Sequence, residues 1–173
     1  ALLVEEGYAL AWVGEARPTG EVVPREAAGA VGYLEGIRVR WDEAPEGQGP
    51  TGRALRSGRP QVLRSVEEDP RYAPWRERAQ VFGFASSAAF PLRVEGRVWG
   101  SLNVYAPEED AFDEEEVRLL EELASLRGQA LDLLQLLTLR QLHHLLFRPR
   151  LRYNQNQNRI PTTQPERPDR VND

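Results

Sequence analysis

Residues 86–106, SSAAFPLRVEGRVWGSLNVYA, predict the element around which the rest of the chain is arranged. Two largely apolar runs, 86–94 and 97–106, are joined by Glu95 and Gly96. A two-residue connection with a glycine that can take a positive φ is typical of a β-hairpin. Because successive side chains of a strand point to opposite faces, each run can cover two layers at once. The stretch therefore indicates an antiparallel sheet.

Further strands are expected upstream of this hairpin. The segment 8–13 is apolar at nearly every position, which favours a strand buried on both faces. The other predicted strands are 21–27, 37–41, which alternates with period two, and 61–66. Short helices are predicted after Pro50, ending at Gly58, and over 74–83, where proline opens and glycine closes the segment. Residues 1–7 resemble the last turns of a helix.

One long helix is predicted over 113–147, with acidic residues in its first turn and leucines three and four residues apart. Only Gly128 interrupts it. Beyond Leu131 the leucines occupy almost every side of the helix, which is more than one domain surface can bury. We therefore expect a homodimer through the terminal helices. Residues 148–173 hold few apolar side chains and are expected to form a flexible tail.

Composition limits the function classes. A chain of 173 residues has room for one domain, and its net charge of −5 offers no basic stripe for nucleic acid. No apolar run is long enough to span a bilayer, so no membrane segment is expected. Without cysteine there are no disulfides, thiolate catalysts or thiolate metal sites. The absence of methionine predicts a fragment or processed product, and no signal segment is present, so we expect a cytoplasmic protein.

The segment 47–54, GQGPTGRA, comes close to the phosphate-binding pattern GxxxxGK[ST]. Arg53 replaces the lysine, Ala54 replaces the hydroxyl residue, and Pro50 removes one of the amides that would line a phosphate cradle. We interpret the glycines instead as a tight loop that leads into a helix beginning at Pro50 or Thr51.

No other group of residues predicts catalysis. The adjacent His143 and His144 point about 100° apart on a helix and cannot share one ion. They are interpreted as surface residues of a dimer helix. The glutamates at 114–116 stabilise a helix N-terminus without any catalytic role. We therefore expect neither an enzyme nor a metal site.

Aromatic and polar residues from several elements indicate a small-molecule pocket, although aromatic residues more often belong to a core. The aromatic set also includes Tyr72, Phe84 and Phe90. The pocket candidates are Tyr33, Trp41, Asp69, Arg71, Trp75, Phe82, Ser86 and Ser87.

The ordered motifs resemble a GAF domain, the small-molecule sensory module of bacterial signalling proteins, phytochromes and cyclic-nucleotide phosphodiesterases. The resemblance covers roughly residues 1–135. Its markers are Gly49-Pro50-Thr51-Gly52, Gly58-Arg59-Pro60, Asp69-Pro70-Arg71, Phe90-Pro91-Leu92, Gly100-Ser101-Leu102-Asn103, and Phe112 followed by acidic residues and Leu119-Leu120. It implies an α+β fold, related to PAS domains, with a central antiparallel sheet of five or six strands. Terminal helices would cover one face, and a pocket closed by loops and short helices would lie on the other.

Departures from the family's patterns narrow the subtype. Bilin-binding members use a pocket cysteine or histidine and haem-binding members an axial histidine, whereas this chain has no cysteine and no histidine before His143. No cofactor is therefore expected, and the cysteine-dependent free methionine sulfoxide reductase activity of this fold is excluded. Of the cyclic-nucleotide pattern only Asn103 and Phe112 remain, which leaves that ligand open without supporting it.

The resemblance leads to two functional hypotheses. In the first, residues 1–135 form a cytoplasmic sensory domain that binds a small molecule, and residues 136–147 extend a dimeric signalling helix toward an output domain. In the second, the chain is a structural dimerisation module whose pocket is filled by its own side chains.

Overall fold

The computed structural model describes residue 3 and residues 7–146, with side chains up to 133. Its centre is a single antiparallel sheet of five strands in the order β2-β1-β5-β4-β3. The strands are β1 (Leu10–Ala16), β2 (Val22–Gly29), β3 (Gln61–Leu63), β4 (Ser86–Val94) and β5 (Arg97–Ala106). This agrees with the predicted α+β class and with the lower of the two predicted strand numbers.

The β4–β5 hairpin has the bounds that the sequence predicts. Both turn residues take a positive φ, 50° at Glu95 and 75° at Gly96, so glycine fills one of these positions and a glutamate the other. The Glu95 backbone N–H donates to Asp132 Oδ1 at 2.8 Å. This bond ties the turn to the long C-terminal helix.

The predicted strand over 37–41 is wrong. This segment runs beside the start of β2 through only two backbone bonds, Val22 N–H to Val39 O and Trp41 N–H to Gly20 O, both 2.9 Å. It then bends away, because the Arg40 N–H turns to Glu46 O. The predicted strand 61–66 is shortened to Gln61–Leu63 at the sheet edge.

Short helices follow the predicted order. Helix α2 (Pro50–Ser57) begins at the predicted proline and ends at Gly58, whose φ is 66°. The helix predicted over 74–83 begins later than expected, because Pro74 lies inside a 3-10 helix, η3 (Pro70–Trp75), and α3 covers Arg76–Val81. Two further 3-10 turns, η1 (Val31–Leu34) and η2 (Pro45–Gly47), complete this layer.

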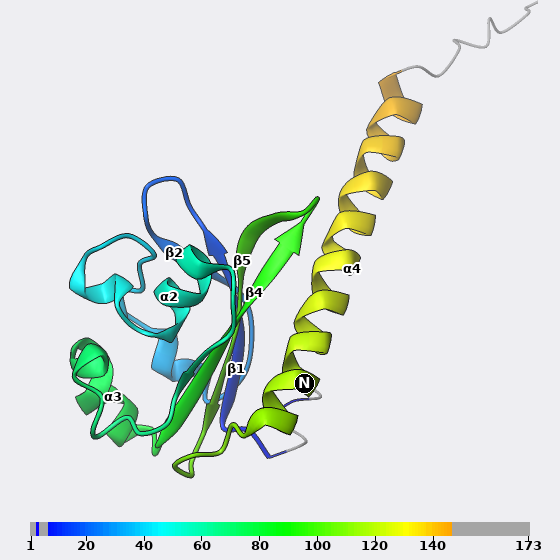
Figure 1. The fold of residues 1–173 in the computed structure, drawn as a ribbon. Coiled ribbons are helices and arrows are strands. Elements are labelled where there is room, and N and C mark those ends of the chain that lie inside the picture. The colour runs from blue at the N-terminus through cyan, green and yellow to red at the C-terminus, as the bar shows by residue number, and fades with distance from the viewer. Residues whose placement is uncertain (1–2, 4–6, 147–173) are drawn as a thin grey trace, which may run out of the picture.

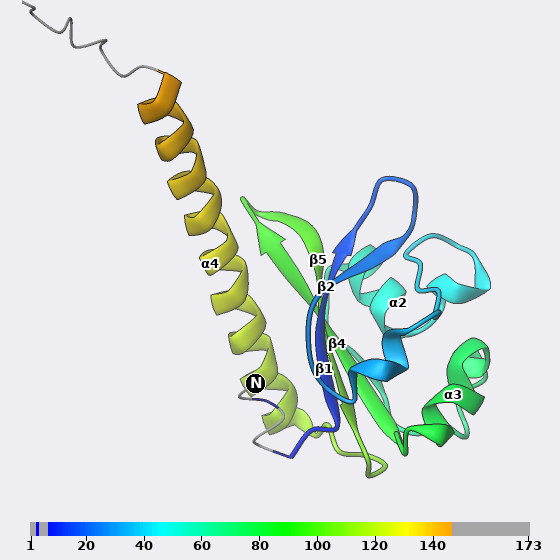
Figure 2. The same ribbon diagram turned by 180° about the vertical axis from the view of Figure 1, so that it is seen from behind.

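Helix α4 (Glu114–Leu146) begins after Asp113, whose Oδ1 accepts the Glu116 N–H at 2.8 Å. It runs along β4 on one face of the sheet and continues past it, whereas α2 and α3 lie on the opposite face (Figure 1). Figure 2 shows the same three layers from behind. None of the helices described is long and apolar enough to cross a membrane. The expected helix over 1–7 falls largely, and the tail 148–173 wholly, outside the described residues.

Each face of the sheet carries its own core. On the side of α4, the helix-face core consists of Val13, Ala88, Phe90, Leu92, Leu102, Val104, Ala106, Phe112, Leu120 and Ala124. On the other side, the pocket-face core consists of Leu10, Trp12, Val22, Tyr33, Leu55, Leu63, Val66, Tyr72, Trp75, Ala79, Phe84 and Tyr105. The strands contribute residues to both cores, because successive side chains of a strand point to opposite faces of the sheet.

Candidate functional site

A small cavity lies within the pocket-face core, where strands β4 and β5 face α2, η1 and η3. Its volume is about 10 Å³, near the lower limit for one water molecule. We call it the tyrosine cavity. Its lining consists of Tyr33, Val39, Glu46, Gly49, Pro50, Thr51, Gly52, Tyr72, Trp75, Ser87, Ala88, Ala89, Asn103 and Tyr105.

Three phenols surround this cavity. The hydroxyls of Tyr33 and Tyr72 lie 2.8 Å apart, and the Tyr105 hydroxyl accepts from Trp12 Nε1 at 3.4 Å. Burial raises the pKa of all three tyrosines above the ordinary value. The hydroxyls therefore stay neutral at physiological pH and can both donate and accept hydrogen bonds.

An asparagine connects the sheet to α2 behind the cavity. Asn103 is only 1% exposed, and its Oδ1 accepts from Thr51 Oγ1 at 2.8 Å. Its Nδ2 donates to Ser101 Oγ at 3.0 Å and to Trp12 O at 3.3 Å. A buried amide is tolerated because its oxygen and nitrogen both have partners. The first turn of α2 is thus held to β5 by side chains.

Trp75 occupies much of the space beside the cavity. Its Nε1 donates to Arg38 O at 2.9 Å, which fixes the plane of the indole. The ring lies directly against the backbone that precedes α2, since a Cβ added at Gly49 would be 2.7 Å from Trp75 Cζ3. The chain's own aromatic groups therefore fill most of this region.

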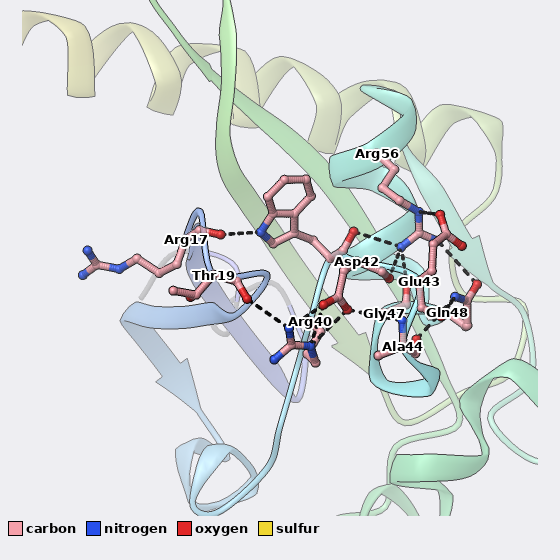
Figure 3. A network of polar contacts seen from close by, with 10 residues as sticks. Arg17, Thr19, Arg40, Asp42, Glu43, Ala44, Gly47, Gln48 and Arg56 are labelled. Atoms are coloured by element: carbon pink, nitrogen blue, oxygen red, sulfur yellow. Dashed lines mark hydrogen bonds and ion pairs between the residues drawn. The ribbon is translucent and has the colours of Figure 1, made fainter.

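A loop closes one side of the cavity, and arginines hold it in place (Figure 3). This cover loop comprises residues 41–48 and contributes Glu46 to the lining. From α2, Arg56 Nη1 donates to three loop carbonyls, Trp41 O at 3.1 Å and Asp42 O and Gly47 O at 2.8 Å each. Arg40, just before the loop, pairs with the side chain of Asp42.

Comparison with known proteins places this architecture in a family. The sequence model of the GAF domain matches residues 1–132. The chain belongs to the GAF domain family. The similar structures include the GAF domain region of a protein assigned as a membrane protein from Geobacter sulfurreducens PCA, at 25% identity and a TM-score of 0.64, covering 76% of this chain and 87% of that one.

Other solved structures share the GAF fold at lower identity. A domain of a protein assigned as a two-component sensor histidine kinase from Sinorhizobium meliloti 1021 is 18% identical, with a TM-score of 0.60 over 76% of this chain and 84% of that one. A type II free methionine-R-sulfoxide reductase from Thermoplasma acidophilum is 17% identical, with a TM-score of 0.61 over 74% and 82%. A search of curated proteins finds no match.

Three of the eight predicted pocket residues line the cavity of this GAF domain: Tyr33, Trp75 and Ser87. Ser86 is wrongly predicted, because the alternation of β4 turns it to the other face, where its Oγ donates to Glu108 O at 2.6 Å. For the same reason Phe90, one of the aromatic set, packs in the helix-face core.

The other four candidates lie around the cavity without lining it. Trp41 donates its Nε1 to Arg17 O at 2.7 Å, and Phe82 stands edge-on behind Tyr33 with the ring centres 5.8 Å apart. Asp69 and Arg71 form an ion pair at the surface, where the Arg71 guanidinium lowers the pKa of the Asp69 carboxyl.

Sequence reasoning missed Asn103, Tyr105 and Thr51 as site residues. Strand alternation puts Asn103 and Tyr105 on one face of β5 and Val104 on the other, so the periodicity of this strand could have indicated both residues. The contact of Thr51 with Asn103 spans 52 positions of the chain and has no local signal.

The glycines of 47–54 serve packing, as the sequence interpretation expects. A Cβ at Gly47 would lie 1.9 Å from Asp42 O, and one at Gly52 would lie 2.1 Å from Gly47 O. The loop therefore packs against its own backbone as it enters α2.

Proposed function

We propose that this GAF domain is the sensory input module of a cytoplasmic bacterial signalling protein. In this proposal it binds a small molecule at the tyrosine cavity and transmits the bound state through α4 to an output domain. Family membership and the signalling proteins among its structural neighbours support a sensory or regulatory role. The observation that carries the proposal is the convergence of neutral phenols and the Ser87 side chain on a cavity inside the core.

The expected ligand is small and combines apolar surface with hydrogen-bonding groups. Aromatic rings supply apolar contacts, while the hydroxyls of Tyr33, Tyr72 and Tyr105 can pair with polar atoms of either kind. Because the present cavity holds about one water, ligand entry requires Trp75 or the cover loop to move. Such a movement would loosen the contacts of α2 and η3 with the sheet.

We infer that the module works without a cofactor and is not an enzyme. Covalent bilin attachment through sulfur and thiol-based reduction both need cysteine, which the chain does not contain. The histidines that could ligate haem are at 143 and 144, on α4 and far along the chain from every lining residue. The structural likeness to methionine sulfoxide reductases concerns the fold alone.

Transmission would pass along α4 into a dimer. Four leucines on this helix keep apolar side chains in solvent: Leu119 (56% exposed), Leu123 (37%), Leu126 (61%) and Leu133 (58%). Their spacings of four, three and seven residues match the seam of a two-helix coiled coil. We propose that α4 of a second copy covers them, so that a change at the sheet alters the helix pair.

One observation favours the second candidate function, a structural dimerisation module. The cavity of about 10 Å³ is nearly filled by the protein's own aromatic side chains. A domain of this kind would need no ligand, and its contribution would be the helix pair alone.

Two buried alanines on neighbouring strands allow a matched test of the two functions. Ala89 on β4 lines the cavity, whereas Ala106 on β5 belongs to the helix-face core and does not line it. Each would be changed to valine. Thermal unfolding and tryptophan fluorescence would be followed with amino acids, 2-oxo acids, nucleosides and cyclic nucleotides, and native mass spectrometry would detect co-purified molecules.

A sensor predicts that at least one probe stabilises the natural protein and Ala106→Val, and that Ala89→Val binds it about tenfold or more weakly, equal to about 1.4 kcal/mol. Binding should also change the emission of Trp75, with Trp75→Phe as the spectral control. If no probe acts on any of the proteins and none carries a co-purified molecule, the sensory proposal fails and the dimerisation module stands.

A further inference from the structure

Arg53 differs from the other arginines near the pocket. Arg56, one turn later on α2, donates to carbonyls of the cover loop. Arg76 donates to Val66 O and Asp69 O, and Arg78 to Gly32 O and Tyr33 O. In the described part of the chain, the only enclosed side-chain nitrogen or oxygen atoms without a hydrogen-bond partner are Nε and Nη2 of Arg53.

An enclosed guanidinium edge without partners is costly. Burial disfavours the charged group unless hydrogen bonds or an opposite charge compensate it. Burial is also the main cause that lowers the pKa of Arg53, and the positive charge of Arg71 adds to it. An anionic group placed against these nitrogens would supply the missing hydrogen-bond acceptors and compensate the charge.

The two enclosed nitrogens define the shape of that counterpart. Nε and Nη2 form one edge of a guanidinium, whose parallel N–H bonds match the two oxygens of a carboxylate or phosphate. Arg71 shows this pairing nearby: its Nε donates to Asp69 Oδ1 at 2.9 Å and its Nη2 to Asp69 Oδ2 at 2.6 Å. The same edge of Arg53 has no such acceptor among the described residues.

The surroundings of Arg53 leave positive charge in excess. The nearby charges that act on its guanidinium are Arg71, Asp69 and Arg56, and the one carboxylate among them is already held by Arg71. A surface hollow of about 560 Å³ borders this pair and is lined by Val62, Arg64, Ser65, Glu68, Asp69, Pro70 and Arg71. The side chain of Arg71 is 50% exposed at this hollow, and its charge acts on the guanidinium of Arg53.

We propose that Arg53 and Arg71 form a binding site for the oxyanion group of a small molecule, a carboxylate or a phosphate, separate from the tyrosine cavity. Neither arginine lines that cavity. A small molecule fits better than an acidic protein segment, because the edge of Arg53 is enclosed and only a terminal group can reach it. The site goes beyond the sensory function and does not depend on it.

The test measures thermal unfolding at pH 7 in sodium phosphate, sodium acetate and sodium chloride at equal ionic strength. Phosphate or acetate should raise the unfolding midpoint of the natural protein by about 3–6 °C more than that of Arg53→Met, at an anion concentration about ten times the dissociation constant. Subtracting the midpoint shift of Arg53→Met from that of the natural protein removes the general stabilisation of proteins by phosphate. The two anions distinguish a phosphate site from a carboxylate site.

Two variants separate binding from folding. In chloride, Arg53→Met should unfold at the same temperature as the natural protein or higher, because it removes an uncompensated charge and keeps the long side chain. Arg56→Met should unfold at a lower temperature in every salt, because the Arg56 guanidinium holds the cover loop, but it should keep the anion-dependent increment of the unfolding midpoint.

Equal increments in the natural protein and Arg53→Met would overturn the proposal, and so would a lower midpoint of Arg53→Met in chloride. Valine at Ala89 leaves this outcome unchanged, so the two proposals can fail independently.

Discussion

The two faces of the central sheet are built from the same strands but hold different chemistry. The helix-face core is apolar, with Ser86 as the one buried polar side chain that the described structure places on that face, and α4 packs on it as a single helix. The pocket-face core places three phenols, two indole N–H groups and the amide of Asn103 among its apolar residues. It is covered by several short helices and a loop.

This difference indicates which face stabilises the domain and which can respond to a ligand. Apolar burial contributes stability without requiring partners, whereas each buried polar group must keep its hydrogen bond. On the pocket face those bonds connect separate elements, such as Thr51 on α2 and Asn103 on β5. Replacing one partner there should change several elements, whereas a change on the helix face should act through packing alone.

The largest effect is expected at Phe90 in the helix-face core. Phe90→Ala should lower the free energy of unfolding by about 3–5 kcal/mol, because it removes a ring that is 0% exposed and leaves a cavity. Urea unfolding measures the loss. Probe binding, measured under conditions where the variant is folded, should be unchanged. Loss of binding by the folded variant would mean that the two faces are not independent.

A smaller effect is expected at Asn103. Asn103→Ala should cost about 1–3 kcal/mol, because the Thr51 hydroxyl loses its acceptor in a buried position. Thr51→Val and the double variant complete a cycle, in which we expect a coupling energy of about 0.5–3 kcal/mol. Strictly additive losses would show that the connection between α2 and β5 contributes nothing.

Gly128 tests how closely α4 approaches the sheet. A Cβ at this position would lie 2.3 Å from Arg93 O, so Gly128→Ala should cost about 1–2 kcal/mol although alanine favours helix by about 1 kcal/mol. Ser125→Ala, on the exposed side of the same helix, should be neutral or slightly stabilising. Stabilisation by both changes would indicate that α4 can move away from the hairpin freely.

The smallest effect on the monomer is expected on the outer side of α4. Leu126→Glu should alter monomer stability by less than about 0.5 kcal/mol, because the side chain is 61% exposed. In analytical ultracentrifugation it should convert the proposed dimer to monomer, while Glu122→Gln should not. A natural protein that sediments as a monomer would refute the helix pair.

Local patterns were sufficient for much of the fold. The hairpin 86–106 followed from two apolar runs and a two-residue turn, and α4 from its leucine spacing and acidic start. The segment 37–41 has the alternation of a strand but lacks a partner strand along its length, so it bends into the cover loop. Alternation alone does not guarantee pairing.

The candidate site was less predictable, because a pocket depends on which faces meet. Of the neighbours Ser86 and Ser87, alternation allows only one to face the pocket, and nothing in their own sequence says which. The glycine loop 47–54 resembles a phosphate motif because close backbone approach requires glycine in both.

The sequence by itself determined the antiparallel hairpin, the long amphipathic helix and membership of the GAF family, since these depend on side-chain periodicity and short motifs. Only the tertiary structure decided that one sheet face carries a core that is apolar apart from Ser86, while the other encloses a tyrosine cavity. It also decided that Arg56 has partners whereas the edge of Arg53 has none among the described residues. The physical reason is that burial and hydrogen bonding depend on residues far apart in the chain, and local periodicity cannot specify which of them meet.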